Sequence, residues 1–231
     1  MDETEFDRFA EEYRAIHAQN IRLSGESPEF FTEYKIVDVV REMSAAPTLM
    51  NPRILDFGAG VGSSVPFFQR WLAPSMLVCL DVSRKSLAIG QERFRGLADF
   101  IAFDGRTIPF EDNSFDLIFT ACVFHHIPHE HHERILEEMH RTLAPAGLLV
   151  IFEHNPFNPL TVQAVKTCPF DENARLIVPG KLRRAIASAG FQQPRIRYRI
   201  FFPGLLRALR PLERAMRWLP VGAQYYIRAE K

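Results

Sequence analysis

The chain has 231 residues, of which 47% are hydrophobic and 24% are charged, and its 28 basic and 28 acidic residues cancel. This length and composition predict one α/β domain with a substantial core, and the neutral charge balance favours no nucleic-acid partner. The three cysteines are far apart and the acidic N-terminus has no apolar core, so we expect a cytoplasmic protein without disulfides or a signal peptide.

Two helices are predicted before the first strand. Apolar residues recur every three or four positions over residues 4–20, which is typical of an amphipathic helix. Ser27 followed by Pro28 predicts the start of a second helix, which runs to about Ser44.

A glycine-rich turn follows the first predicted strand, residues 53–56. After Asp56 the chain places glycines at Gly58, Gly60 and Gly62. Glycines permit positive φ and let a ligand approach main-chain N–H groups, so this turn predicts a nucleotide-type cofactor site. The third glycine of a dinucleotide fingerprint would fall at Ser63, which disfavours a nicotinamide oxidoreductase without removing it as an alternative.

Strands and helices then alternate along the chain. We expect helices near residues 65–71, 83–94 and 129–143, and strands at residues 76–80, 100–103, 117–120 and 148–152. Right-handed crossovers bring the carboxyl ends of such strands to one edge of the sheet. Asp81 closes the second strand 21 residues after Gly60, near the offset of about 20 at which a carboxylate accepts the ribose hydroxyls. An ordinary strand-end acid is the alternative.

A second motif precedes the fourth strand. Pro109-Phe110 is followed, after three residues, by Ser-Phe-Asp-Leu-Ile at residues 114–118. Together with the glycine turn, this run resembles the class I S-adenosylmethionine-dependent methyltransferases of the ubiquinone/menaquinone type, over roughly residues 50–155. The resemblance implies a doubly wound, Rossmann-like α/β fold: a seven-stranded, mostly parallel sheet whose last strand is antiparallel, with helices on both faces and an N-terminal helical flap.

The resemblance also implies S-adenosylmethionine as the cofactor. The glycine turn would hold its methionine end, Asp81 its ribose, and Asp104 with Gly105 its adenine, although Asp-Gly is equally a turn signal. The cofactor-binding residues expected in this way are Asp56, Gly58, Ala59, Gly60, Gly62, Asp81, Val82, Asp104, Gly105, Thr120 and Ala121.

His125 and His126 follow the fourth strand, next to the methyl acceptor in the family that the chain resembles. Imidazole titrates near neutral pH, so both are candidate general bases. Capping or packing of the loop is the alternative, and an acidic acceptor, a sulfur or an activated carbon needs no base. Other histidines lie nearby, but no cysteine has metal-ligand spacing and we expect no metal.

The last third of the chain is less regular. Residues 155–179 are expected to be an irregular loop that walls the acceptor pocket, followed by a helix at 181–188 and strands at 195–202 and 224–229. Between these strands a helix is predicted at 205–219, with one stripe of arginines: Arg207, Arg210, Arg214 and Arg217. With only Glu213 as a nearby acid, the stripe could contact a membrane or an anionic substrate, and a solvated face is the simpler expectation.

We therefore expect one methyltransferase domain over residues 1–231, with a helical flap (1–46), a cofactor core (47–155) and an acceptor side (156–231). It would methylate an O-, N- or C-nucleophile of a small molecule, and a lipid- or glycan-linked acceptor stays open, as does the oligomeric state. A nicotinamide oxidoreductase and a non-catalytic subunit that binds S-adenosylmethionine are the alternatives.

Overall fold

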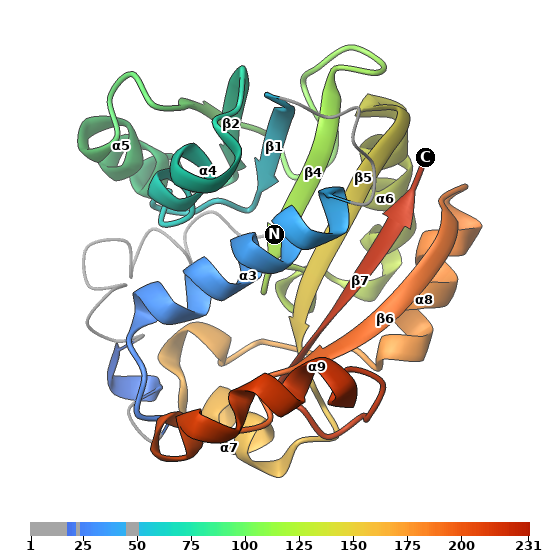
Figure 1. Cartoon of the computed structure of the whole chain (residues 1–231). Helices are drawn as coiled ribbons and strands as arrows, with labels where there is room; N and C mark the ends of the chain where they lie inside the picture. The colour runs from blue at the N-terminus through green and yellow to red at the C-terminus, as the bar shows by residue number, and fades with distance from the viewer. Residues whose placement is uncertain (1–17, 22–23, 45–50) are drawn as a thin grey trace.

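The computed structural model describes residues 18–21, 24–44 and 51–231, so the helix expected at residues 4–20 lies almost wholly outside the described residues (Figure 1). The elements are α3 (Pro28–Met43), β1 (Arg53–Phe57), α4 (Val65–Leu72), β2 (Met76–Asp81), α5 (Arg84–Arg93), β3 (Asp99–Ala102), β4 (Phe115–Ala121), η2 (Phe124–His126), η3 (His129–His131), α6 (His132–Thr142), β5 (Leu143–His154), α7 (Pro159–Thr167), η4 (Pro169–Asp171), α8 (Pro179–Ser188), β6 (Gln192–Arg199), η5 (Gly204–Leu212), α9 (Glu213–Met216) and β7 (Gln224–Glu230).

The seven strands form one sheet in the order β3-β2-β1-β4-β5-β7-β6. Strands β1 to β5 pair in parallel, and β7 runs antiparallel to both β5 and β6. The expected Rossmann-like sheet with an antiparallel last strand is therefore confirmed. The strand order reverses between β1 and β4, and open α/β sheets form a crevice at the carboxyl ends of the strands at such a point.

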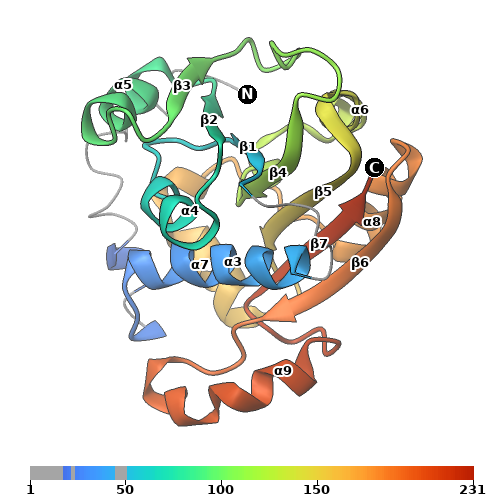
Figure 2. The same cartoon turned by 45° about the horizontal axis from the view of Figure 1, so that its top comes forward.

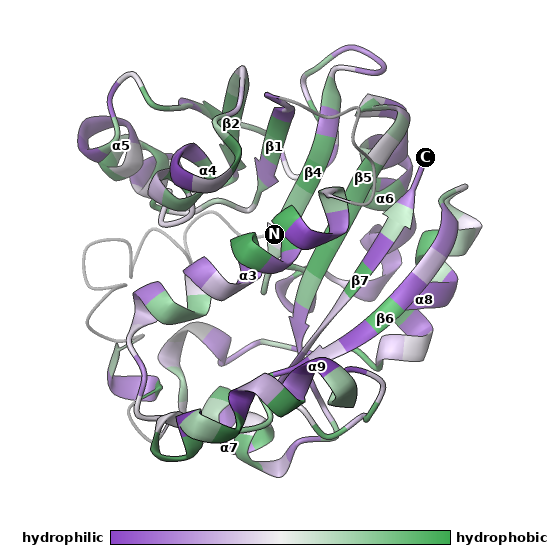
Figure 3. Ribbon diagram, in the orientation of Figure 1, coloured by the Kyte–Doolittle hydropathy of each residue, from purple (hydrophilic) through white to green (hydrophobic). Residues whose placement is uncertain are grey.

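Helices cover both faces of the sheet. Ile36 of α3 and Phe68 of α4 are buried in one core, and Leu136 of α6 and Ile186 of α8 are buried in the other. Figures 1 and 2 show α3 and α4 together in front of the sheet. In Figure 3, β4 and β5 are green over most of their length, because central strands that are covered on both faces carry hydrophobic side chains throughout.

The Pro-Phe-x-x-x-Ser-Phe-Asp motif has a structural role in this fold. Asp116 accepts hydrogen bonds from the Arg53 backbone N–H at 2.8 Å and from the Arg53 guanidinium at 2.8 Å, which ties β4 to β1.

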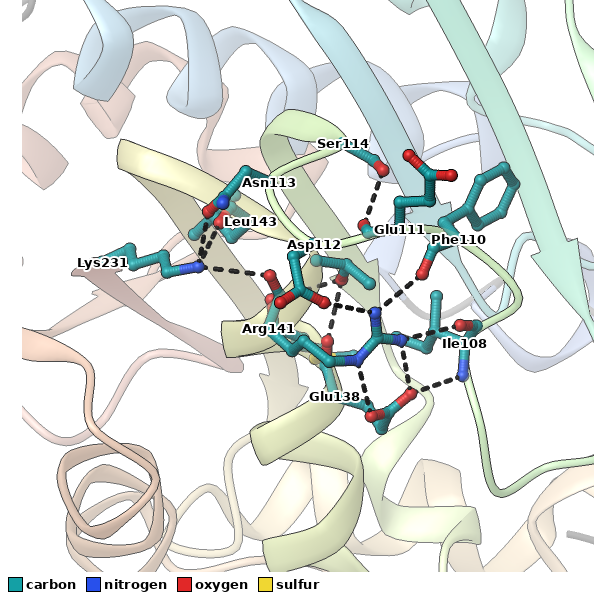
Figure 4. A network of polar contacts seen from close by, with 12 residues as sticks. Ile108, Phe110, Glu111, Asp112, Asn113, Ser114, Glu138, Arg141, Leu143 and Lys231 are labelled. Atoms are coloured by element: carbon teal, nitrogen blue, oxygen red, sulfur yellow. Dashed lines mark hydrogen bonds and ion pairs between the residues drawn. The ribbon is translucent and has the colours of Figure 1, made fainter.

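The loop before β4 is held by one arginine at the end of α6. Arg141 donates to the carbonyls of Phe110 at 2.7 Å and of Ile108 at 2.9 Å, and pairs with Glu138 and Asp112 (Figure 4). Glu138 in turn accepts the Ile108 N–H at 2.9 Å. The partly buried Arg141 guanidinium thus bonds to two carbonyls of this loop, of which Ile108 also accepts the Phe110 N–H at 2.8 Å.

The segment 155–179 was wrongly expected to be irregular throughout, since it contains α7. Asn158 caps this helix by accepting the Thr161 N–H, and Pro159 occupies its first turn. An Asn followed by Pro is a helix-start signal of the same kind as Ser27-Pro28, which α3 confirms.

The continuous helix expected at residues 205–219 was also wrong. The chain first forms a 3-10 segment, η5, which has non-helical dihedrals at Leu206 and contains Pro211. The short helix α9 follows it. Proline removes a backbone donor and so disfavours a regular helix there. Strand β6 ends at Arg199 rather than at 202, because Ile200 takes a positive φ of 60° and the next two N–H groups bond to Glu213 instead of to a strand.

Among the described residues, none of the helices is both long enough and apolar enough to cross a membrane.

Candidate active site

The expected cofactor residues lie at the carboxyl ends of four adjacent strands. Phe57 of β1 aligns with Leu80 of β2 on one side and with Thr120 of β4 on the other, and Asp81 aligns with Ala102 of β3. Neighbouring strands are about 4.8 Å apart, so the turns that leave these strands adjoin one another.

The glycine turn packs closely against its neighbours. The N–H groups of Gly58 and Ala59 both donate to the carbonyl of Leu80, at 2.7 and 3.2 Å. Gly58 has a φ of 75°, and a Cβ there would overlap the side chain of Val123 in the loop after β4. Gly60 has a φ of 55°, and no atom of the residues that the structure describes lies within 4 Å of the place a Cβ would take, so this side of the backbone is open to a ligand in the described part of the chain.

Asp56 is buried beneath this turn, where its carboxylate accepts a hydrogen bond from the Ser64 hydroxyl. Burial raises the pKa of Asp56 to about 7, although the Ser64 hydrogen bond opposes the shift. The bond between Asp56 and Ser64 joins the two ends of the glycine turn. Asp56 is therefore a residue that holds the turn in this structure.

Asp81 joins the glycine turn to the end of β2. Its Oδ2 accepts the Gly60 N–H at 2.8 Å and its Oδ1 accepts the Ser83 N–H at 2.9 Å. The adjacent Val82 lies beside the next turn, with Cγ1 3.6 Å from the place of a Cβ on Gly105. The carboxylate expected to meet the ribose is therefore next to the open side of Gly60.

The other expected cofactor residues lie nearby in different environments. Asp104 is exposed, and its Oδ1 accepts the N–H groups of Arg106 and Thr107 at 2.8 Å each; these bonds lower the pKa of Asp104. Such a hydrogen-bonded turn is the alternative role noted for Asp104. Thr120 is buried with no hydrogen-bond partner for its hydroxyl in the part of the chain that the structure describes, and Ala121 beside it is half-buried.

His125 is buried between two carboxylates. Its Nδ1 lies 2.6 Å from Oε2 of Glu153, and its Nε2 lies 3.3 Å from Oδ1 of Asp171. Burial alone would lower the pKa of His125, but the two carboxylates outweigh it and hold the pKa well above the ordinary 6.5. At neutral pH the ring is a cation that donates through both nitrogens.

Glu153, at the end of β5, organises the loop after β4. Its Oε1 accepts the N–H groups of Val123 at 3.1 Å and of Phe124 at 2.8 Å, while Oε2 bonds His125. Burial raises the pKa of Glu153, but the charge of His125 outweighs it and the pKa lies below its ordinary value. The fully buried carboxylate is thereby satisfied on both oxygens.

Asp171 brings the acceptor-side segment onto the two histidines. Besides His125, it lies 3.4 Å from Nε2 of His126, and the Arg175 N–H donates to the His125 carbonyl at 2.8 Å. Burial raises the pKa of Asp171, and the hydrogen bond from His125 overcomes it, giving about 2. Burial and the charge of His125 lower the pKa of His126 to about 3, so His126 is neutral.

Cys122 and His154 lie beside these groups. The Cys122 sulfur, on a residue with a φ of 59°, lies 3.7 Å from Nζ of Lys35 and 3.7 Å from Nε2 of Gln224. Burial raises the pKa of Cys122, but His154 and Lys35 outweigh it, and the result is about 7. Burial lowers the pKa of His154, and the Cys122 charge raises it above the ordinary value.

Sequence reasoning missed the residues that surround the two histidines, namely Lys35, Cys122, Glu153, His154 and Asp171. A signal for Glu153 and His154 was available, because they end a predicted parallel strand at the functional edge. For Lys35 and Asp171 no local signal exists, since only the packing of α3 and η4 brings them here.

One ligand atom each from His125, His126 and Asp171 lies within 4.8 Å of the others, a spacing that could hold a metal ion. In this structure the Asp171 carboxylate lies 3.3 Å from Nε2 of the charged His125 and 3.4 Å from Nε2 of the neutral His126. The expectation of no metal stays a prediction.

Part of the chain is similar in sequence to known methyltransferases. Residues 55–151 match the family model described as methyltransferase domain. The chain is 33% identical over 114 residues to a phthiotriol/phenolphthiotriol dimycocerosates methyltransferase of Mycobacterium ulcerans, covering 48% of this chain and 41% of that protein. It is 31% identical over 137 residues to a ubiquinone/menaquinone biosynthesis C-methyltransferase of Pseudomonas entomophila, covering 56% of this chain and 52% of that protein. The chain thus spans about half the length of these curated relatives.

Solved structures share the fold. A S-adenosylmethionine-dependent methyltransferase of Thermotoga maritima, described as a possible histamine N-methyltransferase, aligns with a TM-score of 0.67 at 20% identity over 99% of both chains. Phosphoethanolamine N-methyltransferase 2 of Haemonchus contortus, in complex with S-adenosyl-L-methionine, aligns with a TM-score of 0.62 at 16% identity over 86% of this chain and 52% of that one.

The sheet order, the glycine turn and the matched segment together indicate the class of protein. Residues 55–151 match a methyltransferase domain and the chain has the fold of solved S-adenosylmethionine-dependent methyltransferases, which confirms the resemblance seen in its motifs.

Proposed function

We propose that the protein transfers a methyl group from S-adenosylmethionine to a small-molecule acceptor. The observation that supports this proposal most is the hydrogen bond from the Gly60 N–H to the Asp81 carboxylate, which places an open glycine backbone beside an acid. Both residues lie on the same edge of the sheet as the His125 cluster. The cofactor fits this cradle, because any Cβ at Gly60 would occupy the side from which a ligand approaches.

The cofactor-binding set expected from the sequence is proposed to hold S-adenosylmethionine, with the glycine turn at its methionine end, Asp81 at its ribose, and Asp104 with Gly105 at its adenine. When bound, the cofactor supplies a methyl group on a sulfonium, which is already electrophilic. The protein then has to align the acceptor and exclude water. This role agrees with a division into a flap (1–46), a cofactor core (47–155) and an acceptor side (156–231).

Of the two proposed bases, only His126 is neutral. It is neutral because its pKa is about 3, whereas His125 already carries a proton between Glu153 and Asp171. A pKa of about 3 makes His126 a weak base, since general bases work best with a pKa near the operating pH. We therefore propose His126 as the group that accepts a proton from the acceptor and His125 as the cation that positions it.

The acceptor is proposed to lie against the His125 cluster and segment 168–175. The two curated relatives are named for phthiotriol/phenolphthiotriol dimycocerosates and for ubiquinone/menaquinone biosynthesis. A lipid- or glycan-linked acceptor stays within this proposal. The three cysteines are free, which supports the cytoplasmic location proposed from the sequence.

Calorimetric titration tests the proposal, with S-adenosylmethionine, its demethylated product and NAD as ligands. We expect the first two to bind the wild-type protein, and Asp81→Ala to weaken both about tenfold or more, because a charged hydrogen-bond acceptor is lost. Asp99→Ala is the matched control, since Asp99 is an exposed acid at the start of β3 and should leave both affinities unchanged.

The two alternatives predict different results. Binding of NAD alone would replace the proposal with a nicotinamide oxidoreductase. Binding of S-adenosylmethionine without formation of its demethylated product, across a panel of hydroxyl, amine and carbon-acid acceptors, would favour the non-catalytic subunit.

A further inference from the structure

An arginine-lined pocket of about 540 Å³ lies between α3 and the η5–α9 segment. Its aromatic wall is formed by Phe30 and Tyr34 of α3. The arginines that line it come from three parts of the chain: Arg41, Arg199, Arg207, Arg210 and Arg214. Figures 1 and 2 both show η5 and α9 beyond the carboxyl end of β6, alongside the first half of α3.

Some of these arginines are neutralised by acids that are distant in sequence. Arg199 pairs with Asp38 and lies 3.4 Å from Glu213, and Arg210 pairs with Glu26. The stripe expected at residues 205–219 therefore has more matching acids than Glu213 alone, which corrects the sequence-based reading.

Two arginines of the pocket have no acidic partner among the residues that the structure describes. Arg207 and Arg214 form no hydrogen bond or ion pair with any residue that the structure describes, and both are exposed. Arg210 stacks 4.5 Å from the centroid of Phe30, so its guanidinium is held in place. A pocket lined by these two guanidinium groups is a site for an anion with several oxygens, because a guanidinium donates to such oxygens in pairs.

The pocket lies on the same edge of the sheet as the proposed methyl-transfer site. His154 of β5 aligns with Gln224 of β7, and Gln224 aligns with Arg199 of β6. Two strand spacings separate His154 from Arg199, about 10 Å. Tyr34, in the pocket wall, donates to the Gln224 side chain, which in turn contacts Cys122.

We propose that this pocket binds a phosphate group of the methyl acceptor, on the same edge of the sheet as the proposed methyl-transfer site. The proposal rests on the proposed function, which puts the acceptor atom at the His125 cluster. The same chemistry fits a free phosphorylated metabolite and a phospholipid headgroup. Leu205 and Trp218 on this segment are 93% and 71% exposed. Exposed apolar side chains beside the pocket could contact a bilayer, so binding to a phospholipid headgroup is tested separately.

The test titrates inorganic phosphate into the full chain at constant ionic strength. We expect Arg207→Gln/Arg214→Gln to raise the Kd for phosphate about tenfold or more, because two charge-assisted contacts are lost. The control is Arg95→Gln/Arg183→Gln, which removes the same charge from two exposed arginines on other elements and should leave the Kd unchanged. An equal loss in both variants, or no loss in the first, would overturn the proposal.

Vesicles distinguish the two sources of phosphate. Co-sedimentation with phosphatidylglycerol-containing vesicles, but not with phosphatidylcholine alone, and its loss in Arg207→Gln/Arg214→Gln, would assign the site to a lipid headgroup. Phosphate binding without co-sedimentation would assign it to a free acceptor. Wild-type protein that binds neither probe would refute the site.

Titration of both variants with S-adenosylmethionine separates this proposal from the proposed function. We expect unchanged cofactor affinity in both variants. Phosphate binding in a protein that does not bind S-adenosylmethionine would leave the pocket standing and remove the methyl-transfer assignment.

Discussion

Glu153 accepts hydrogen bonds from two backbone N–H groups and one imidazolium in a site without exposure to solvent. Each partner belongs to the loop that also contacts Gly58 through Val123. The carboxylate therefore controls both the charge of His125 and the position of the loop between the cofactor turn and the acceptor side. Removing its charge should affect His125 more than any other group.

At the residue scale we predict that Glu153→Gln lowers the free energy of unfolding by about 3 kcal/mol, because one partner of a buried ion pair is lost. The pKa of His125 is raised in the fold, so the pair's stabilisation is present below 6.5 and is lost as pH rises through the raised value. The pKa of Glu153 is lowered, so stabilisation is present above 4.5 and is lost as pH falls. The difference between wild type and variant should thus be largest between pH 4.5 and 6.5.

Urea unfolding of both proteins at several pH values measures this difference. Glu137→Gln, an exposed acid on α6, is the control and should change stability by less than about 0.5 kcal/mol. A difference that grows steadily from pH 6.5 upward would contradict the assigned charge of His125.

At the scale of elements, the loop before β4 depends on one side chain of α6. Arg141 donates to two carbonyls of this loop, at Ile108 and Phe110, and is bidentate to Glu138. We predict that Arg141→Ala lowers the free energy of unfolding by about 2 kcal/mol, because charge-assisted hydrogen bonds are lost and the Phe110 carbonyl is left without a donor among the described residues, while the Ile108 carbonyl keeps the Phe110 N–H.

Thermal unfolding with a calorimeter gives this value, and Arg134→Ala on the same helix is the control. Arg134 is exposed, so its loss should cost less than about 0.5 kcal/mol. Equal effects of the two substitutions would show that the Arg141 network contributes little.

At the scale of the whole molecule, the proposed cofactor site joins turns from four strands of one sheet. A ligand that contacts all of them binds only the folded state and stabilises the entire domain. We predict that S-adenosylmethionine at about 100 times its Kd raises the free energy of unfolding by about 2.7 kcal/mol. Differential scanning calorimetry with and without the ligand measures this shift, and NAD at the same concentration should produce none. A shift with NAD and none with S-adenosylmethionine would contradict the assigned cofactor.

The sequence by itself determined the sheet and the proposed cofactor edge. Gly58, Gly60 and Asp81 belong to one strand-helix-strand unit, and right-handed crossovers leave such a unit only one arrangement. The alternating apolar runs likewise predicted all seven strands. These features are local, so spacing and periodicity are sufficient to read them.

Only the tertiary structure decided the charges of the acceptor side and the partners of the arginines. Arg199 meets Asp38 across 161 positions and Arg210 meets Glu26 across 184. His125 is a cation and its neighbour His126 is neutral because of burial and the carboxylates that converge on them. Ion pairing and desolvation depend on distances in space, which the packing of α3, η4 and η5 sets and sequence spacing does not record.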